Sequence, residues 1–160
     1  MDVVGRIEIK GPLSHAEVLA RSSDCDVGLS IIPQDNEDIN FMHMVGASNK
    51  PFDYLACGLA VLVSDRPDWK EIYVEPNYGL ACDPDNPESI ASALQWFLEH
   101  PKEMREMGER GRQRILNEWN YEQQFSPVLE RLNGESSFKR AGNNLGCGER
   151  TLQNRANGAG

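Results

Sequence analysis

Apolar residues occur along the chain in short runs separated by polar segments, and the runs have the length of buried strands. A run of about four to eight apolar residues between glycine, proline or polar residues is typical of a strand inside a parallel sheet. The first strand is indicated instead by an alternation of apolar and polar positions, which ends at Gly11-Pro12. Strands are therefore predicted over residues 6–10, 27–32, 60–63 and 79–82.

Apolar positions spaced three and four residues apart predict helices between and after these strands. Ser14 can cap the first helix, which extends to about residue 22, and Gly58 ends a helix over residues 50–57. The clearest helix begins at Asn86-Pro87, a capping residue followed by a proline at the first helical position. Further helices are predicted over residues 67–74, from Pro101, and from about residue 121 to Gly134 despite Pro127.

Strands that alternate with helices predict an α/β fold: a partial Rossmann-like domain with a parallel sheet and flanking helices, and a helical C-terminal part. After Gly134 the composition changes to Gly, Asn, Ser and Arg with few apolar residues. Such a segment buries too little apolar surface to offset its ordering entropy. We expect one domain over residues 1–133 and a disordered tail over 134–160, which could equally come from a frame shift or from sequence added for expression.

The formal net charge of −9 argues against nucleic acid as a partner and requires any anion site to be local. No apolar run reaches the ~20 residues that cross a bilayer. The start Met1-Asp2 lacks the basic and apolar regions of a signal peptide, so we expect a cytoplasmic protein without a transmembrane segment. The cysteines are far apart without a C-x-x-C pair, which disfavours zinc and a disulfide framework. We expect neither a metal nor another cofactor.

The most informative segment extends over residues 48–65, where a short helix leads into a buried strand. It is expected to place Lys50 and Asp53 in the first turn of that helix. A helix N-terminus presents unpaired backbone N–H groups and the positive end of the helix dipole, which suits a diphosphate, and Lys50 adds a full charge there. Asp53 shares a helix face with Lys50 and offers a carboxylate that could accept both hydroxyls of a ribose.

A long polar loop precedes this helix, over residues 34–49. Loops of this length are uncommon in compact domains unless they bind a ligand. Gly46 and Ala47 keep the loop small enough for a phosphate to approach backbone N–H groups. Ser48 and Asn49 complete the candidate binding segment.

Each candidate residue also has an ordinary structural explanation. Lys50 could be a solvated lysine, although a cation at a helix start opposes the dipole unless an anion compensates it. Asp53 could be an acid that stabilises the first helical turn without any ligand. Tyr54 could line the site, but an aromatic at that spacing is more often part of a core. His15 and His43 have no sequence partner that suggests catalysis, so no catalytic residue is assigned.

The segment resembles the donor-binding lobe of retaining, two-lobed (GT-B) glycosyltransferases of group 1, which use nucleotide sugars. The signature over residues 49–65 is followed, in the order of that family, by Glu71-Ile72, by residues 78–94 and by Trp119-Asn120-Tyr121, so that about residues 5–133 are covered. Asp53 corresponds to the second of two family glutamates and is implied to contact the donor nucleotide, whereas Val45 stands where many relatives have the first. The resemblance implies a donor site made of Gly46, Ser48, Asn49, Lys50, Asp53 and Tyr54.

The resemblance also implies that the chain begins downstream of the first units of the donor lobe and lacks the acceptor lobe. We expect a glycosyltransferase fragment, inactive alone, that binds a UDP-, GDP- or similar sugar and in the complete enzyme transfers the sugar to an acceptor. The expected mechanism is electrostatic stabilisation of the leaving diphosphate, without a metal. Two alternatives are a non-catalytic interaction or nucleotide-binding module and another sugar-nucleotide enzyme such as an epimerase. The expected protein partner is the missing lobe or a second copy of the chain.

Overall fold

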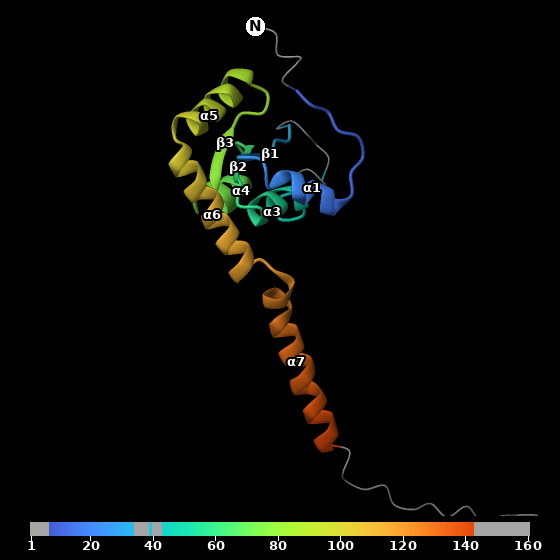
Figure 1. Ribbon diagram of the computed structural model, residues 1–160. Helices are drawn as coiled ribbons and strands as arrows, with labels where there is room; N and C mark the ends of the chain where they lie inside the picture. The colour runs from blue at the N-terminus through green and yellow to red at the C-terminus, as the bar shows by residue number, and fades with distance from the viewer. Residues whose placement is uncertain (1–6, 34–38, 40–42, 143–160) are drawn as a thin grey trace, which may run out of the picture. The chain divides into compact units, whose positions relative to one another are not determined.

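The computed structural model describes residues 7–33, 39 and 43–142, with side chains as far as residue 133. These residues form two units, and the boundary lies between Asn120 and Tyr121. The first unit contains a sheet and the helices packed on it, and the second contains the helix α7 (Tyr121–Gly142) (Figure 1). Each unit is described by itself.

The sheet of the described residues has the strand order β1 (Val27–Ser30), β2 (Ala60–Ser64) and β3 (Gly79–Cys82). Both neighbouring pairs are parallel, with Leu29 opposite Leu62 and Leu62 opposite Leu80. The intervening helices return the chain to the start of the next strand, as parallel pairing requires. The predicted α/β architecture with a parallel sheet and flanking helices is confirmed.

Strand β2 is buried on both of its faces, and every one of its residues is buried. Val61 and Val63 belong to one hydrophobic cluster, whereas Ala60 and Leu62 belong to another. This division follows from the two-residue period of a strand, whose successive side chains point to opposite faces. It explains why β2 appears in the sequence as a continuous apolar run rather than as an alternation.

The first cluster joins the sheet to α3 (Asn49–Ala56), α4 (Pro67–Trp69) and the π-helix η2 (Lys70–Val74). Leu55, Trp69 and Tyr73 are its fully buried members from these helices. The pattern predicted one ordinary helix over residues 67–74, but the helix widens: the Glu75 N–H donates to the Lys70 carbonyl at 2.9 Å, five residues back. A π-turn accommodates one extra residue in a helix.

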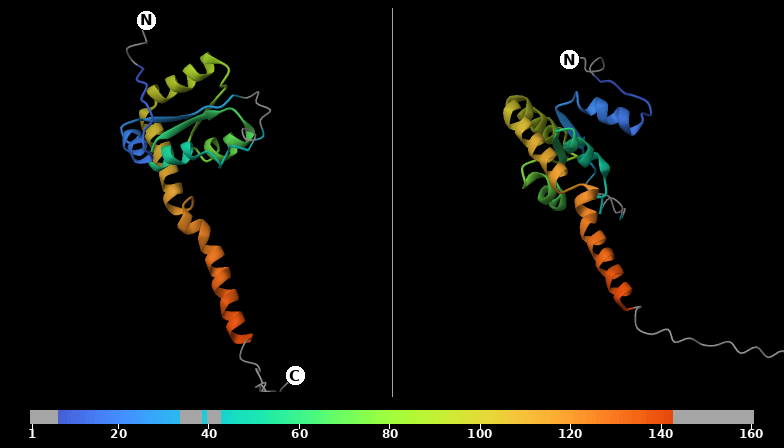
Figure 2. Two further views of the ribbon diagram at one scale, coloured as in Figure 1. Left: turned by 90° about the vertical axis from the view of Figure 1, so that its right-hand side faces the viewer. Right: turned by 60° about the horizontal axis from the view of Figure 1, so that its bottom comes forward.

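The second cluster joins the sheet to α5 (Pro87–Glu99) and α6 (Pro101–Asn117) through Phe97, Met104 and Met107. In the left view of Figure 2, α6 crosses the strands steeply. A Cβ built on Gly108 would lie 1.9 Å from the carbonyl oxygen of Gly58, so α6 approaches the turn after α3 backbone to backbone. Gly58 itself has φ of 79°, a conformation that ends α3 and that other residues rarely adopt.

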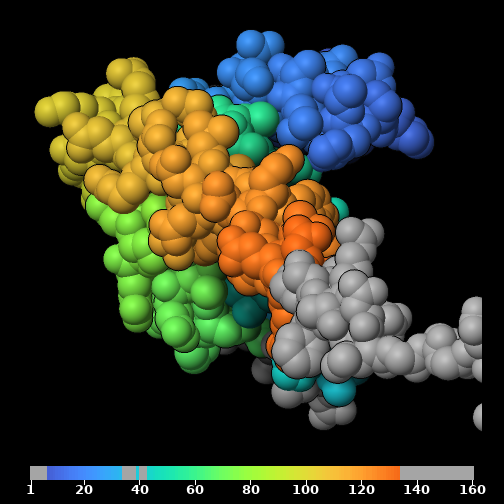
Figure 3. Space-filling view, turned by 90° about the horizontal axis from the view of Figure 1, so that it is seen from below, coloured from blue at the N-terminus to red at the C-terminus, as the bar shows by residue number. Residues whose placement is uncertain are grey.

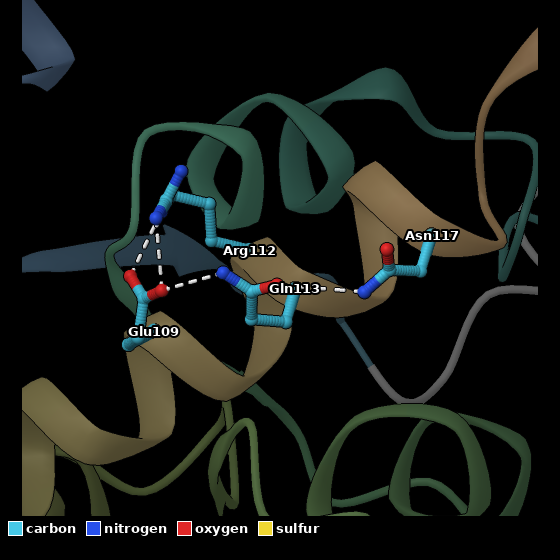
Figure 4. Close-up of polar contacts among 4 residues, drawn as sticks. All are labelled: Glu109, Arg112, Gln113 and Asn117. Carbon is cyan, nitrogen blue, oxygen red and sulfur yellow. Dashed lines mark hydrogen bonds and ion pairs between the residues drawn. The ribbon is translucent and has the colours of Figure 1, made fainter.

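The exposed face of α6 carries a chain of polar contacts one helical turn apart (Figure 4). Arg112 donates two hydrogen bonds of 2.8 Å to the Glu109 carboxylate, and Gln113 donates a third of the same length. Asn117 in turn donates to the Gln113 side-chain oxygen at 3.4 Å. The hydrogen bonds from Arg112 and Gln113 lower the pKa of Glu109 to about 2.

Helix α1 (His15–Ser22) begins with a capping box, as the predicted Ser14 cap requires. The Ser14 hydroxyl accepts from the Glu17 N–H, and the Glu17 carboxylate accepts from the Ser14 N–H at 2.8 Å. The Ser14 hydroxyl also donates to the Glu17 carboxylate at 2.6 Å, and this bond, together with the one from the Ser14 N–H, lowers the pKa of Glu17. Figure 3 shows the N-terminal residues packed beside α3, and the Cys57 thiol donates to the Leu19 carbonyl at 3.7 Å between the two helices.

The predicted strand over residues 6–10 is wrong for its described part, because residues 7–10 have no strand structure. Ile7 and Ile9 are exposed, and Glu8 pairs with Lys10. An alternating segment becomes a strand only where a neighbouring strand takes up its hydrogen bonds. Within the described chain, residues 7–10 have no such neighbour.

Helix α7 continues through Gly134 to Gly142, so the predicted end of the last helix at Gly134 is wrong, while the disordered tail stays a prediction. A glycine inside a helix costs only about 1 kcal/mol relative to alanine, so a single glycine does not by itself end a helix. Residues 143–160 of the expected tail lie outside the described residues. No helix in the described ranges is long and apolar enough to cross a membrane.

Candidate functional site

The candidate site lies where the chain passes from β1 into α3, at the carboxyl side of the sheet. In open parallel sheets this side is where ligands bind, because the loops after the strands gather there. The Ser64 hydroxyl at the end of β2 accepts from the Ile32 N–H and donates to the Ile32 carbonyl, each at 2.7 Å. Ser64 thereby fixes the direction in which the chain leaves β1 towards the loop.

The described end of the loop forms a tight turn ahead of α3. The N–H groups of Ala47 and Ser48 both donate to the Met44 carbonyl, at 3.0 and 2.9 Å, and Gly46, inside the turn that these bonds close, has φ of 73°. This left-handed conformation favours a glycine at position 46. Met44 and Val45 are half-buried against the first hydrophobic cluster, which anchors the turn.

Helix α3 starts without a side-chain cap. Ser48 occupies the capping position in an extended conformation, but its hydroxyl accepts no hydrogen bond from the helix. By contrast, the Asn86 side chain accepts from the Glu88 and Ser89 N–H groups at the start of α5, at 3.0 and 3.3 Å. Among the described residues, no side chain caps the first N–H groups of α3, which can therefore donate to a ligand.

Lys50 is the second residue of α3 and is exposed. No carboxylate of the described residues pairs with its ammonium group. Asn49 before it is also exposed, and the buried Pro51 after it has no N–H group. A lysine here adds its charge to the positive end of the helix dipole, and nothing described compensates that charge.

Asp53 lies one residue further along α3 than expected, just past its first turn. It is the fifth residue of the helix, so the expected place in the first turn is wrong, and α3 has no acid in its first turn. The difference arises because the helix starts at Asn49. Its carboxylate faces α1: Nε2 of His15 lies 3.1 Å from each of its two oxygens. The side chain of Asp53 is 26% exposed and that of His15 is 67% exposed.

Tyr54, the remaining candidate, packs on the sheet. A Cβ built on Gly28 of β1 would lie 2.2 Å from Cγ of Tyr54, so the ring rests directly on the backbone of that glycine. Burial raises the pKa of the Tyr54 hydroxyl, and the charges of Asp53 and Cys25 raise it further. Tyr54 lines a groove between α1 and β1, together with Leu13, Val18 and Leu29.

Tyr73 supports the loop from beneath and was not recognised as a candidate from the sequence. Its side chain is fully buried, and burial raises its pKa to about 12, against a smaller lowering by the Gly46 backbone. Its hydroxyl has no hydrogen bond of standard geometry with the described residues. The hydroxyl therefore lies next to the turn at Gly46 with unused hydrogen-bonding capacity. The spacing of apolar residues around Tyr73 does not indicate that its hydroxyl lies beside Gly46.

The structure thus brings Gly46, Ser48, Asn49 and Lys50 together in one turn and helix start, with Asp53 one turn later and Tyr54 on the sheet. His15 was missed as a partner of Asp53, because 38 residues separate them and no local pattern links them. Glu71 is exposed on η2. His43 is exposed, and its backbone N–H donates to the Ile39 carbonyl.

Comparison with known proteins gives one family and one similar structure. The family described as glycosyl transferase-like matches residues 2–130. The sucrose-phosphate synthase of Thermosynechococcus elongatus has a similar structure, with a TM-score of 0.57 and 19% sequence identity over 88% of this chain. The match covers 32% of that synthase, so the chain spans about a third of its length. No curated protein sequence matches significantly. At this identity the structural similarity establishes the fold, which agrees with the resemblance to GT-B enzymes.

Proposed function

Because the chain belongs to the glycosyl transferase-like family, we propose that it binds a nucleotide-sugar donor at the start of α3 and serves sugar transfer to an acceptor in a complete enzyme. The observation that carries this proposal is the combination at Ser48–Lys50: a helix start that the Ser48 side chain does not cap, and at its second position an exposed lysine that pairs with no carboxylate of the described residues. Two independent sources of positive potential coincide there.

The diphosphate of the donor suits this position. Its oxygens can accept from the first N–H groups of α3 while the Lys50 ammonium supplies a charge-assisted bond. Gly46 has no side chain to obstruct the approach, and a Cβ built there would meet no atom within 4 Å. The exposure of Asn49 and Lys50 leaves both accessible to a ligand from solvent.

The nucleoside is assigned to Asp53. Each oxygen of a carboxylate has two lone pairs, so Asp53 can accept from both hydroxyls of a ribose. Asp53 lies about one helical turn, or about 5.4 Å along the axis, beyond the start of α3. This distance suits a ribose whose phosphates bind at the helix start. Asn49 and Tyr54 flank these two positions in the sequence.

Catalysis in the complete enzyme would be electrostatic. As the bond between the sugar and the diphosphate breaks, negative charge develops on the leaving phosphate oxygen. The start of α3 and Lys50 would stabilise this developing charge more strongly than they stabilise the bound donor before the reaction. Only such a difference between transition state and bound donor accelerates the reaction. The acceptor, and any group that removes its proton, would come from elsewhere in that enzyme.

The test is a calorimetric titration of the 160-residue chain with UDP, GDP and inorganic diphosphate. Lys50→Ala should weaken all ligands that carry the diphosphate by about tenfold, because a charge-assisted bond contributes ~1.5–3 kcal/mol and this lysine is exposed to screening. Asp53→Ala should weaken only the nucleotides. Lys102→Ala is the matched control, because Lys102 is likewise exposed and is the second residue of α6. If wild type, Lys50→Ala and Asp53→Ala bind these ligands with equal affinity, the start of α3 is not the donor site.

A non-catalytic binding module is the second candidate function, and the packing of Val45 favours it. Val45 stands at the position of the first family glutamate and is packed against the first hydrophobic cluster. No carboxylate is therefore available from that position to hold the donor sugar. If the chain binds UDP or GDP as tightly as the corresponding UDP- or GDP-sugar, the sugar is not recognised and this second function is favoured.

A further inference from the structure

The contact between His15 and Asp53 connects the first helix to the proposed nucleoside position. Nε2 of His15 lies 3.1 Å from Oδ1 and 3.1 Å from Oδ2, so the ring nitrogen is centred on the carboxylate. A nitrogen placed in this way donates one proton to both oxygens, either as the protonated ring or as the neutral Nε2–H form. The carboxylate is thereby fixed in rotation about its last bond.

This contact leaves Asp53 able to bind a ligand. Each oxygen uses part of its accepting capacity on His15 and keeps the rest for a hydroxyl group. The Asp53 side chain is 26% exposed, so its carboxylate is accessible from one side. A carboxylate with a fixed orientation loses less rotational freedom when a diol binds than a freely turning one does.

The first helix is built to hold His15 at this place. His15 is the first residue of α1, and the capping box of Ser14 and Glu17 fixes the turn that presents it. A second link, from the Cys57 thiol just after α3 to the Leu19 carbonyl, joins the two helices one turn beyond Asp53. These two links, one turn apart on α3, hold the imidazole and the carboxylate in register.

We propose that His15 is a positioning residue for nucleoside recognition, acting through the orientation of Asp53. The proposal rests on the proposed function, because it requires Asp53 to contact the nucleoside. His15 contacts Asp53, whereas the proposed diphosphate position is at the start of α3. Its removal therefore affects the nucleoside part of the ligand and leaves the binding of inorganic diphosphate unchanged.

The experiment measures UDP, GDP and inorganic diphosphate affinities of the full chain by calorimetry. His15→Ala should weaken nucleotide affinity by about three- to tenfold. The substitution removes a hydrogen bond to the charged Asp53 carboxylate, and this bond affects the nucleotide only through the orientation of Asp53. His15→Gln should restore most of the affinity, because its amide can donate to the carboxylate. In the Asp53→Ala background, His15→Ala should have no further effect. Cys57→Ala is the control, because it weakens the docking of α1 without changing Asp53.

Three results would overturn the inference: unchanged nucleotide affinity in His15→Ala, an equal loss for inorganic diphosphate, or full additivity of His15→Ala with Asp53→Ala. An equal loss in Cys57→Ala would show that α1 only supports the fold, with the same consequence. The proposed function fails in a different way. A chain that binds no nucleotide, or one in which Lys50→Ala and Asp53→Ala bind like wild type, overturns both proposals, whereas an inert His15→Ala beside a sensitive Asp53→Ala overturns only this one.

Discussion

Ser64 makes two hydrogen bonds with the backbone of Ile32, one as donor and one as acceptor, each 2.7 Å long. Ser64 is fully buried at the end of β2, and Ile32 lies two residues beyond the end of β1. The Ser64 side chain thus provides the two hydrogen bonds that a neighbouring strand would otherwise make with the backbone of Ile32. The loop that leads to α3 starts from a point fixed by this one hydroxyl.

Ser64→Ala should destabilise the chain by about 1–3 kcal/mol, because it leaves the part-buried N–H and carbonyl groups of Ile32 without this partner. The measurement is the free energy of unfolding in urea. Ser92→Ala is the control: the Ser92 hydroxyl donates to the Glu88 carbonyl at 2.8 Å on an exposed helix face, so its loss should change the free energy of unfolding little. Equal effects of the two substitutions would show that Ile32 finds other partners.

Gly108→Ala should destabilise more than Gly111→Ala. The new methyl group at position 108 would meet the Gly58 carbonyl oxygen at 1.9 Å, and backbone cannot move aside as a side chain can. At position 111 the nearest atom is Cδ2 of Leu55, at 2.3 Å, at the end of a side chain. Overpacking of this kind costs about 1–3 kcal/mol or more, against a gain of about 1 kcal/mol in helix propensity.

The control for this pair is Gly11→Ala, because a Cβ at Gly11 would meet no atom within 4 Å. Thermal unfolding of the three variants should give the lowest melting temperature for Gly108→Ala and a value close to wild type for Gly11→Ala. A Gly108→Ala variant as stable as wild type would contradict the close approach of α6 to the turn after α3.

Glu109 should titrate near pH 2, because the hydrogen bonds from Arg112 and Gln113 favour its ionised form. Since the pKa of Glu109 in the folded chain lies below the ordinary glutamate value of 4.5, its contribution to stability is present above about pH 4.5 and is lost as the pH falls towards 2. Carbon-detected NMR of the carboxyl group measures the midpoint. Arg112→Ala should raise it towards 4.5, and Lys102→Ala on the same helix should leave it unchanged.

The isolated chain should self-associate through α7. Its apolar residues remain exposed along the described part of the helix: Tyr121, Phe125, Val128, Leu129 and Leu132. An exposed apolar stripe promotes association. Light scattering should give an apparent mass that rises with concentration in the wild type and less in Phe125→Glu/Leu129→Glu. Leu98→Glu on α5 is the control, since Leu98 is also exposed. A strictly monomeric wild type at high concentration would contradict the prediction.

Much of the first unit could be predicted from the sequence because its signals are local. Asn86 and Pro87 mark the start of α5 at the residue where it occurs, and the run at β2 indicates a strand buried on both faces. The alternation over residues 6–10 gave a wrong strand, because pairing depends on a neighbour that the alternation does not specify. The widening of η2 at Lys70–Val74 has no sequence signal of comparable strength.

The candidate site was predicted where it is contiguous and missed where it is not. Gly46 to Lys50 form one turn and helix start, which the glycine and the lysine indicate by themselves. The partner of Asp53 comes from a helix 38 residues away, and the hydroxyl of Tyr73 reaches the loop through the core. Such contacts depend on how the helices dock, and residue spacing along the chain contains no information about docking.

The missing cap of α3 has a consequence for local stability. Asn86 protects the first amides of α5, whereas the amides of Asn49 and Lys50 have no such acceptor from Ser48. Hydrogen exchange at the start of α3 should therefore be faster than at the start of α5. An anion that binds there completes the helix, so part of its binding free energy is spent on ordering that first turn, and its affinity is linked to the opening equilibrium of the helix end.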